Sequence, residues 1–382
     1  MDALTALRSA KRVVIKIGSS LLTDLESGTL KQDWLSALID DVAALGDTEV
    51  VLVSSGAVAL GRGELGLTKS ALRLEESQAA AATGQVRLTH AYQEALSRHG
   101  KKAAQVLLTI EDTEQRRRYL NARSTLLALL KLGAVPIVNE NDTVATQELR
   151  YGDNDRLAAR VAAMVGADLL IILSDVDGLY DKNPREHDDA ALIPLIDQIT
   201  PAIQAMAGGT GSFVGSGGMK TKIDAAEIAT AAGAHVVIAR GTIAHPLNAL
   251  LEGGKASLFL SHQSPGSARK TWIVGTLKSS GTITIDAGAA HALLGGKSLL
   301  PAGVTQVEGD FHKGDAVDVK DAHGTVLARG LTGYDATEAE AIAGAQSADI
   351  EKILGFPGRA SLIHRDDLVL TNAPQSPKSK ES

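Results

Sequence analysis

The sequence predicts an α/β protein built on an open, mainly parallel sheet that is sandwiched by helices. Short β-branched apolar runs alternate with longer segments of helical spacing, and this alternation implies right-handed βαβ units. Aromatic residues make up only 3% of the chain, while Ala, Val, Leu and Gly dominate. That balance is more typical of helices packed on a parallel sheet than of an aromatic-rich β-sandwich.

Six apolar runs are the expected buried parallel strands of this sheet. They are VVIKI from Val13, EVVLVS from Glu49, AAQVLLT from Ala103, AVPIVN from Ala134, DLLIILS from Asp168 and HVVIA from His235. Segments between them carry apolar residues at helical spacing, as between Trp34 and Leu45. The last clear βα unit ends near Phe259.

The composition changes after this point and predicts a second domain. Residues 263–275 are rich in Ser, Pro and Gly, so we expect a linker between a first domain, 1–262, and a small β-rich domain, 276–370. The second domain has short alternating runs, TITID, VTQVEG, AVDVK and TVLARGL, with DAHG as a hairpin turn between the last two. Helical pieces are expected at 287–294 and 335–343. Residues 371–382 are polar and are expected to be a disordered tail.

Composition excludes several classes of chemistry. The chain of 382 residues contains no cysteine, which removes disulfides, thiolate metal sites and cysteine nucleophiles. Its formal charge of -7 gives no support to a general nucleic-acid-coating role. The apolar run near the N-terminus is too short for a signal peptide or a membrane span, so we expect a cytoplasmic protein.

Three glycine-containing segments could bring backbone N–H groups, hydroxyls or lysine ammonium groups close to phosphate oxygens. Lys16–Ser20 ends the first strand, Ser54–Ala57 follows the second, and Gly215–Lys222 leads into a helical pattern. Each has a purely structural alternative. Lys16 can extend its amine to solvent at an edge, the serines can cap a helix, and the glycine-rich segment can serve as a flexible linker.

Two glycine-rich strings lack the context that a nucleotide motif requires. Gly61–Gly66 matches a dinucleotide fingerprint but lies several residues beyond the strand end. Gly295–Ser298 resembles the end of a P-loop, but His291 stands where the leading glycine belongs. The sequence also has no HExxH zinc motif and no GxSxG nucleophile elbow. Arg116–Arg118 opens a helical pattern and is read as a solvated or subunit-facing surface.

Acidic and amide residues follow other strand ends, at Asn139–Thr143, Gly152–Asp155 and Ser174–Tyr180. Singly, each could be an ordinary N-cap or turn. Because the carboxyl ends of parallel strands converge on one edge, we expect these groups and the lysine–glycine segments to form one crevice. Such a crevice suits phosphate, magnesium and a small polar substrate.

Taken in order, these motifs resemble those of the amino acid kinase family. The resemblance is carried by VVIKIGSS, VLVSSGAVALG, NENDTVAT, YGDNDRLAA, LSDVDGLY and GSGGMKTK, from Val13 to about Ile238. The stretch from SLLPAGVTQVEG onward resembles a PUA domain, a pseudobarrel that binds RNA in many other proteins. Between Gly275 and Leu370 there are eight Lys plus Arg and thirteen Asp plus Glu. We therefore expect a regulatory or assembly role for this domain rather than RNA binding.

The resemblance implies phosphorylation of the side-chain carboxylate of L-glutamate by ATP, the first step of proline biosynthesis. It implies catalytic roles for Lys16, Lys222 and Asp155, with Asp155 orienting the two lysines. The glutamate-binding positions that it implies are Ser55, Asp142 and Asn154. The implied ATP-binding positions are Lys16, Gly18, Ser174, Asp175, Ser216, Gly217, Gly218, Met219, Lys220, Thr221 and Lys222, and Gly18, Gly56 and Gly218 are expected to offer backbone amides.

Some positions depart from relatives, since Ser174 stands where threonine is common and Lys220 where a smaller residue is common. Magnesium is expected as the ATP counterion, with no protein ligands that can be named. The resemblance further implies feedback inhibition by proline and a homodimer or homotetramer, and a contact with the next enzyme of proline synthesis is also expected. Two alternatives remain: a sibling kinase acting on another carboxylate or carbamate, and an RNA-binding protein with a vestigial kinase domain.

Overall fold

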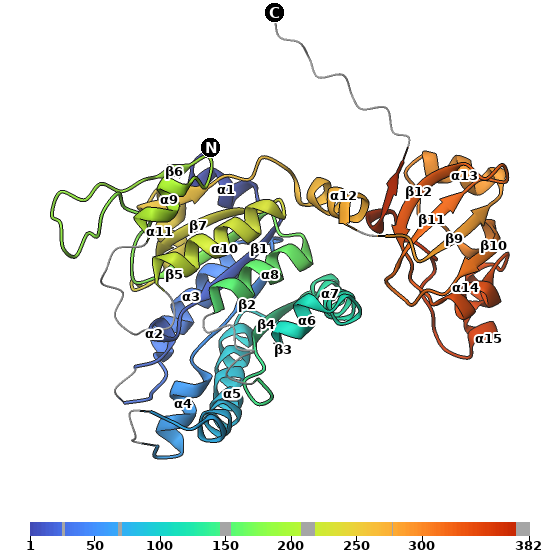
Figure 1. Cartoon of the computed structure of the whole chain (residues 1–382). Helices are drawn as coiled ribbons and strands as arrows, with labels where there is room; N and C mark the ends of the chain where they lie inside the picture. The colour runs from blue at the N-terminus through green and yellow to red at the C-terminus, as the bar shows by residue number, and fades with distance from the viewer. Residues whose placement is uncertain (25–26, 68–70, 146–153, 208–217, 277, 372–382) are drawn as a thin grey trace, which may run out of the picture. The chain divides into compact units, whose positions relative to one another are not determined.

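The computed structural model describes residues 1–24, 27–67, 71–145, 154–207, 218–276 and 278–371 (Figure 1). The chain divides into two compact units, Met1–Pro265 and Gly266–Ser382. Most of the expected linker 263–275 is helical, because α12 spans Pro265–Thr276. Proline is favoured in the first turn of a helix, so the Pro, Gly and Ser here mark a helix start rather than an extended connection. The domain limits of 1–262 and 276–370 remain a prediction.

The first unit contains one eight-stranded sheet with the order β3-β4-β2-β1-β5-β7-β8-β6. The six expected strands are all present, and every pairing is parallel except that of β7 with β8. The strands are β1 (Arg12–Ile17), β2 (Glu49–Val53), β3 (Lys102–Leu108), β4 (Ala134–Glu140), β5 (Leu169–Ser174), β6 (Leu195–Ile196), β7 (His235–Arg240) and β8 (Ala256–Phe259). Strand β3 is not buried as expected, since it lies at the sheet edge and only Leu108 is fully enclosed.

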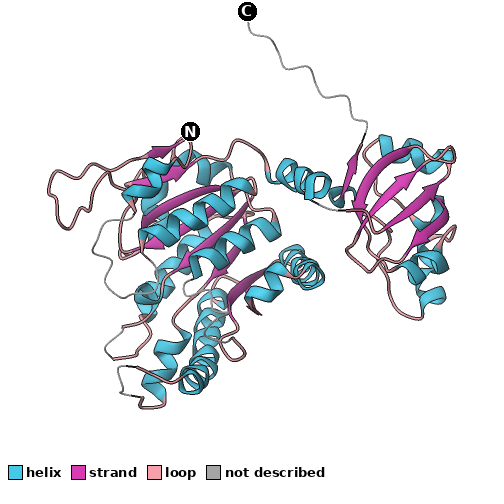
Figure 2. Ribbon diagram, in the orientation of Figure 1, coloured by secondary structure: helices cyan, strands magenta, loops and turns pink. Residues whose placement is uncertain are grey.

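Helices cover both faces of this sheet (Figure 2). Side chains of β1 alternate between two cores. Val13, Ile15 and Ile17 pack with α1, α3, α5 and α11, whereas Val14 packs with α7, α8 and α10. The helices are α1 (Ala3–Ser9), α2 (Ser19–Leu22), α3 (Gln32–Ala44), α4 (Ala57–Glu64), α5 (Leu74–Ser97), α6 (Ile110–Glu114), α7 (Arg116–Lys131), α8 (Asn154–Val165), α9 (Pro201–Met206), α10 (Met219–Ala231) and α11 (Pro246–Leu251). The predicted sandwich architecture is confirmed.

Helices α4 and α5 cross at glycines. A Cβ atom on Gly61 would lie 1.8 Å from the backbone oxygen of Ala80, and one on Gly84 would lie 1.9 Å from that of Ala57. Both distances are far below van der Waals contact, so only glycine permits this approach of the two backbones. Gly61 therefore has a role in helix packing. This agrees with the interpretation that Gly61–Gly66 is not a nucleotide-binding motif.

The second unit is a five-stranded sheet with the order β10-β9-β11-β12-β13 and short helices around it. Its elements are β9 (Gly281–Ile285), α13 (Ala287–Leu294), β10 (Val304–Gly309), β11 (Ala316–Lys320), β12 (Val326–Leu331), α14 (Ala336–Ile342), α15 (Ile350–Leu354) and β13 (Leu368–Leu370). The expected hairpin joins β11 to β12, and Gly324 takes a positive φ of 84° in its turn. Strand β13 was not expected, and residues 372–382 of the expected tail lie outside the described residues.

None of the helices in the described ranges is long and apolar enough to cross a membrane.

Candidate active site

The carboxyl ends of the central strands bring the predicted groups to one edge of the sheet. Strand β1 lies between β2 and β5, and in this register Lys16 is opposite Val53 on one side and Ile172 on the other. The chain departs from β1 toward β2 in one direction and reaches β5 in the other, which makes this edge a topological switch point. Ligands of open α/β sheets bind at such a point.

Asp155 joins the two predicted lysines into one buried cluster. Lys16 follows the alternation of β1, so its side chain points to the same face as Val14, where α8 and α10 pack. Its Nζ lies 2.6 Å from Oδ1 of Asp155, in the first turn of α8. Nζ of Lys222, in the first turns of α10, lies 3.0 Å from Oδ2 of the same carboxylate. The predicted catalytic set therefore converges in space.

Burial strengthens the electrostatic interactions within this cluster. The side chains of Lys16 and Lys222 are 7% and 6% exposed and that of Asp155 is fully enclosed. Burial alone would raise the pKa of Asp155, but the two ammonium groups outweigh it and hold that pKa below its ordinary value. The Thr221 hydroxyl also donates to Oδ2 of Asp155 at 3.0 Å. One ionised carboxylate thus positions two cations at the end of β1.

The predicted backbone amide donors share a structural position. Gly18, Gly56 and Gly218 are the N-cap residues of α2, α4 and α10. Gly56 takes a φ of 99°, which explains the need for glycine at this turn. N–H groups in the first turn of a helix are not used within the helix and are available to an anion. A Cβ on Gly18 would lie 3.8 Å from Nζ of Lys16, so this N-cap is next to the cationic cluster.

Asn154 connects the ends of two strands, β2 and β4, through its side-chain amide. Its Nδ2 donates to the backbone oxygen of Ser54 at 2.5 Å, to Oγ of Ser55 at 3.0 Å and to Oδ1 of Asn139 at 2.8 Å. The structure therefore brings two predicted glutamate-binding residues, Ser55 and Asn154, into direct contact. The third, Asp142, lies half-buried in the turn after β4.

The sequence analysis did not identify Gln85 and Tyr92, which contact the hydrogen-bond partners of Asn154. Nδ2 of Asn139 donates to Oε1 of Gln85 at 2.8 Å, and the hydroxyls of Ser54 and Tyr92 lie 3.0 Å apart. Gln85 and Tyr92 come from α5, and burial raises the pKa of Tyr92. Two polar groups within the buried stripe of a long helix are the signal that could have identified them.

The described part of the chain includes most, but not all, of the expected ATP-binding residues. Ser174 ends β5 in a buried position, and its hydroxyl donates to Oδ1 of Asp175 at 3.1 Å. Oδ2 of Asp175 lies 2.6 Å from the Arg185 guanidinium. Burial raises the pKa of Asp175, but the Ser174 hydrogen bond and Arg185 together lower it below its ordinary value.

Helix α10 supplies four of the other expected nucleotide contacts. Gly218 caps it, Met219 is half-buried, Lys220 is exposed, and the Thr221 hydroxyl contacts both Asp155 and the backbone oxygen of Gly218. Ser216 and Gly217 lie outside the described residues.

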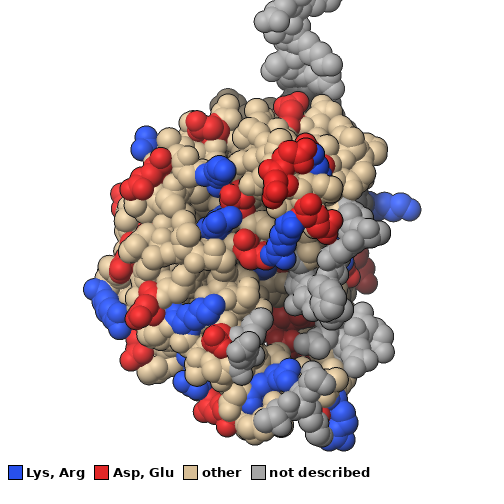
Figure 3. Space-filling view, turned by 90° about the vertical axis from the view of Figure 1, so that its left-hand side faces the viewer, with Lys and Arg blue, Asp and Glu red and all other residues tan. Residues whose placement is uncertain are grey.

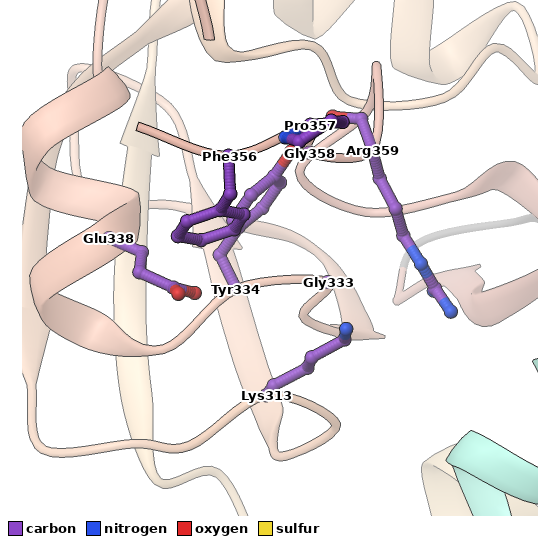
Figure 4. Close-up of a pocket in the computed structure, with 8 residues that line it drawn as sticks. All are labelled: Lys313, Gly333, Tyr334, Glu338, Phe356, Pro357, Gly358 and Arg359. Atoms are coloured by element: carbon purple, nitrogen blue, oxygen red, sulfur yellow. The ribbon is translucent and has the colours of Figure 1, made fainter. Parts of the chain in front are cut away.

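On the face in Figure 3, basic and acidic side chains are interspersed and neither sign forms a continuous patch. The second unit has a pocket of about 230 Å³, where Figure 4 shows Phe356 beside Tyr334, with Glu338 on one side and Lys313 and Arg359 on the other. None of the predicted site residues lines it.

Comparison with known proteins agrees with this geometry. The model of the amino acid kinase family matches residues 11–240, and that of the PUA domain matches residues 281–354. The chain belongs to the amino acid kinase family. Within it, the chain groups with the glutamate 5-kinases. It is 59% identical to the glutamate 5-kinase of Agrobacterium fabrum, over 96% of this chain and 95% of the relative. For that of Paramagnetospirillum magneticum, identity is 57% over 96% of this chain and 100% of the relative.

Solved structures of more distant proteins match part of this chain. A UMP kinase from Ureaplasma parvum covers 65% of this chain and 98% of its own, with 14% identity and a TM-score of 0.47. The family match places the lysine–aspartate cluster and Asn154 within the amino acid kinase part of the chain, and the pocket of Figure 4 outside it. The expected PUA resemblance of the second unit is confirmed.

Proposed function

We propose that this glutamate 5-kinase transfers the γ-phosphoryl group of ATP to the side-chain carboxylate of L-glutamate, giving L-glutamyl 5-phosphate. The reaction is the first step of proline biosynthesis. The observation that carries the proposal is the pair of buried lysines on one carboxylate, in a chain 59% identical to a glutamate 5-kinase. Phosphoryl transfer needs positioned positive charge more than a protein nucleophile, because the substrate carboxylate is itself the nucleophile.

Lys16, Lys222 and Asp155 have distinct roles in this proposal. Lys16 and Lys222 hold phosphoryl oxygens and stabilise the charge that spreads over them in the transition state. Asp155 positions both amines, and its fully buried carboxylate fixes them before the substrate arrives. Gly18 and Gly218 add N–H donors from helix N-termini that face the same edge.

The glutamate-binding site is assigned to the neighbouring polar residues Ser55, Asn154 and Asp142. Ser55 and Asn154 already contact each other at 3.0 Å, and Asp142 supplies a carboxylate that can pair with the α-ammonium group. The Asn139 and Gln85 amides behind Asn154 fix its orientation. Because Asn154 directly precedes Asp155 in α8, we assign the side-chain carboxylate of the bound glutamate to the side of the lysines, from which it can attack the γ-phosphorus.

Magnesium accompanies ATP in this proposal, with the phosphate oxygens among its ligands. Within the described ranges, no three histidine or acidic side chains form a cluster that could hold a metal ion. The donor set of two ammonium groups fits phosphate oxygens rather than a bare cation, since like charges repel. The metal supplies neutralisation of phosphate charge, and the lysines position the γ-phosphoryl group.

Trapping the product tests this proposal. The protein is incubated with ATP, magnesium and hydroxylamine, and with glutamate, aspartate, N-acetylglutamate or no acceptor. An acyl phosphate forms a hydroxamate, which is expected with glutamate alone. Hydroxamate with another acceptor would assign the chain to a sibling activity, and none with any acceptor would reject carboxylate phosphorylation.

Regulation and assembly remain part of the proposal. Adding proline to the same assay is expected to suppress hydroxamate formation, and a homodimer or homotetramer is expected in solution. The PUA domain is assigned a regulatory or assembly role, since its charge of eight basic against thirteen acidic residues between Gly275 and Leu370 disfavours phosphodiester backbones.

A further inference from the structure

Two lysine amines at this site share a single carboxylate. Nζ of Lys16 lies 2.6 Å from Oδ1 of Asp155, and Nζ of Lys222 lies 3.0 Å from Oδ2. Each carboxylate oxygen therefore forms an ion pair with one ammonium group. Both amines are nearly buried, and the Thr221 hydroxyl completes the contacts of Oδ2. A lysine in such a place has two chemical states: a cation that binds phosphate, and, after loss of a proton, a nucleophile.

The second state is hazardous in the proposed reaction, on which this inference rests. The product is an acyl phosphate, formed beside these amines, and acyl phosphates acylate neutral amines. The nitrogen lone pair would attack the acyl carbon, and the bond from that carbon to the phosphate oxygen would break. Inorganic phosphate would leave with the electron pair, and the nitrogen would lose a proton to give an amide. The lysine would then be permanently neutral.

We propose that Asp155 protects Lys16 and Lys222 from acylation by the product, because each amine is engaged in a buried ion pair with one oxygen of its carboxylate. Removing the carboxylate charge would leave two cations close together in a water-poor site. Burial and like-charge repulsion both favour the neutral form of an amine. One lysine would then become a nucleophile, as in enzymes that activate a buried lysine beside a second cation.

The ionisation of Asp155 supports this role. Burial by itself would raise the pKa of this carboxyl, and the two ammonium groups outweigh that effect and lower it. The carboxylate therefore stays charged at neutral pH, so the protection is present throughout the working range. Positioning of phosphate and protection of the amines thus come from the same two ion pairs.

Acetyl phosphate is a suitable probe, because it is an acyl phosphate that requires no turnover by the enzyme. The full-length protein is treated with it, and acetylation of each lysine is followed by peptide mass spectrometry. Lys220 is exposed and lies two residues before Lys222, so it is the internal reference. In the wild-type protein, we expect Lys220 to be acetylated while Lys16 and Lys222 stay free. In Asp155→Asn, acetylation of Lys16 or Lys222 relative to Lys220 should rise at least about tenfold.

Several controls separate protection by charge from protection by burial. Asp155→Glu keeps a carboxylate and should return labelling toward the wild-type level, and circular dichroism establishes that each variant is folded during labelling. If the two buried lysines of a folded Asp155→Asn protein stay unlabelled, burial alone protects them and the proposal is overturned.

A measurement on the wild-type protein does not depend on the variant folding. When the pH is raised, labelling of Lys220 should increase while Lys16 and Lys222 stay unlabelled, and a parallel increase at all three would overturn the proposal. The hydroxamate assay tests the proposed function separately, because acetyl phosphate labelling does not require glutamate or ATP.

Discussion

Replacing Lys222 by alanine tests the assigned transition-state role. The Lys222 side chain is 6% exposed and its ammonium is fixed 3.0 Å from Asp155, so water cannot readily replace it. Loss of one such preorganised charge lowers turnover by about 100- to 1,000-fold. We therefore expect kcat of Lys222→Ala to fall at least about a hundredfold, with a smaller change in the KM for glutamate.

Lys222→Ala should also lower the free energy of unfolding, so its effect on kcat must be separated from its effect on stability. Breaking a buried ion pair costs about 3–5 kcal/mol, and the lower end applies because Asp155 keeps Lys16 as a partner. A typical domain has about 5–15 kcal/mol of stability, so most of the variant should remain folded. Urea unfolding measures this cost, and glutamate-dependent ADP release measures kcat. Lys255→Ala, an exposed lysine before β8, is the matched control and should match wild type in both.

A near-normal kcat would refute the reasoning. If folded Lys222→Ala kept kcat within about threefold of wild type, the ammonium would not stabilise the transition state.

Three other changes have distinct expected outcomes. Asp142→Ala should raise the KM for glutamate most, and unchanged glutamate dependence in steady-state assays would move the substrate site elsewhere. Gly84→Ala should lower the urea unfolding free energy by about 1–3 kcal/mol, because its Cβ would meet the backbone of Ala57 at 1.9 Å, while Gly266→Ala, whose Cβ meets nothing within 4 Å, should be close to neutral. The lowered pKa of Asp155 means that its stabilisation is present above the ordinary carboxyl pKa and is lost as pH falls through the lower folded-state value. The stability difference between wild type and Asp155→Asn should therefore narrow below about pH 4, and a constant difference would contradict the assignment.

Much of the first unit could be predicted because local rules decide its strands and the edge at which their carboxyl ends meet. The six apolar runs all form strands, five of them buried, and parallel strands bring their carboxyl ends to one edge. The alternation of β1 also fixes the face of Lys16, which is the face of Val14 where α8 and α10 pack. The grouping of Lys16 with Asp155 and Lys222 was predicted from the resemblance to the amino acid kinase family, and not from a local pattern.

Other features depend on packing between distant segments, which local patterns do not determine. Gln85 and Tyr92 support the site from α5, and nothing in their own spacing indicates which strand ends they meet. The crossing of α4 and α5 at Gly61 and Gly84 is likewise a property of two helices together. The Ser-, Pro- and Gly-rich stretch at 263–275 suits both a linker and a helix start, and most of it lies in α12.

Oxygen isotope transfer tests the central claim most directly. Glutamate labelled with oxygen-18 in its side-chain carboxylate is turned over with ATP and magnesium, and the acyl phosphate is trapped with hydroxylamine. Hydroxylamine attacks the acyl carbon, so the bridging oxygen leaves with phosphate. If the glutamate carboxylate attacks the γ-phosphorus, each released phosphate should carry one oxygen-18 atom. Unlabelled phosphate would show that water is the acceptor and would contradict carboxylate phosphorylation at this site.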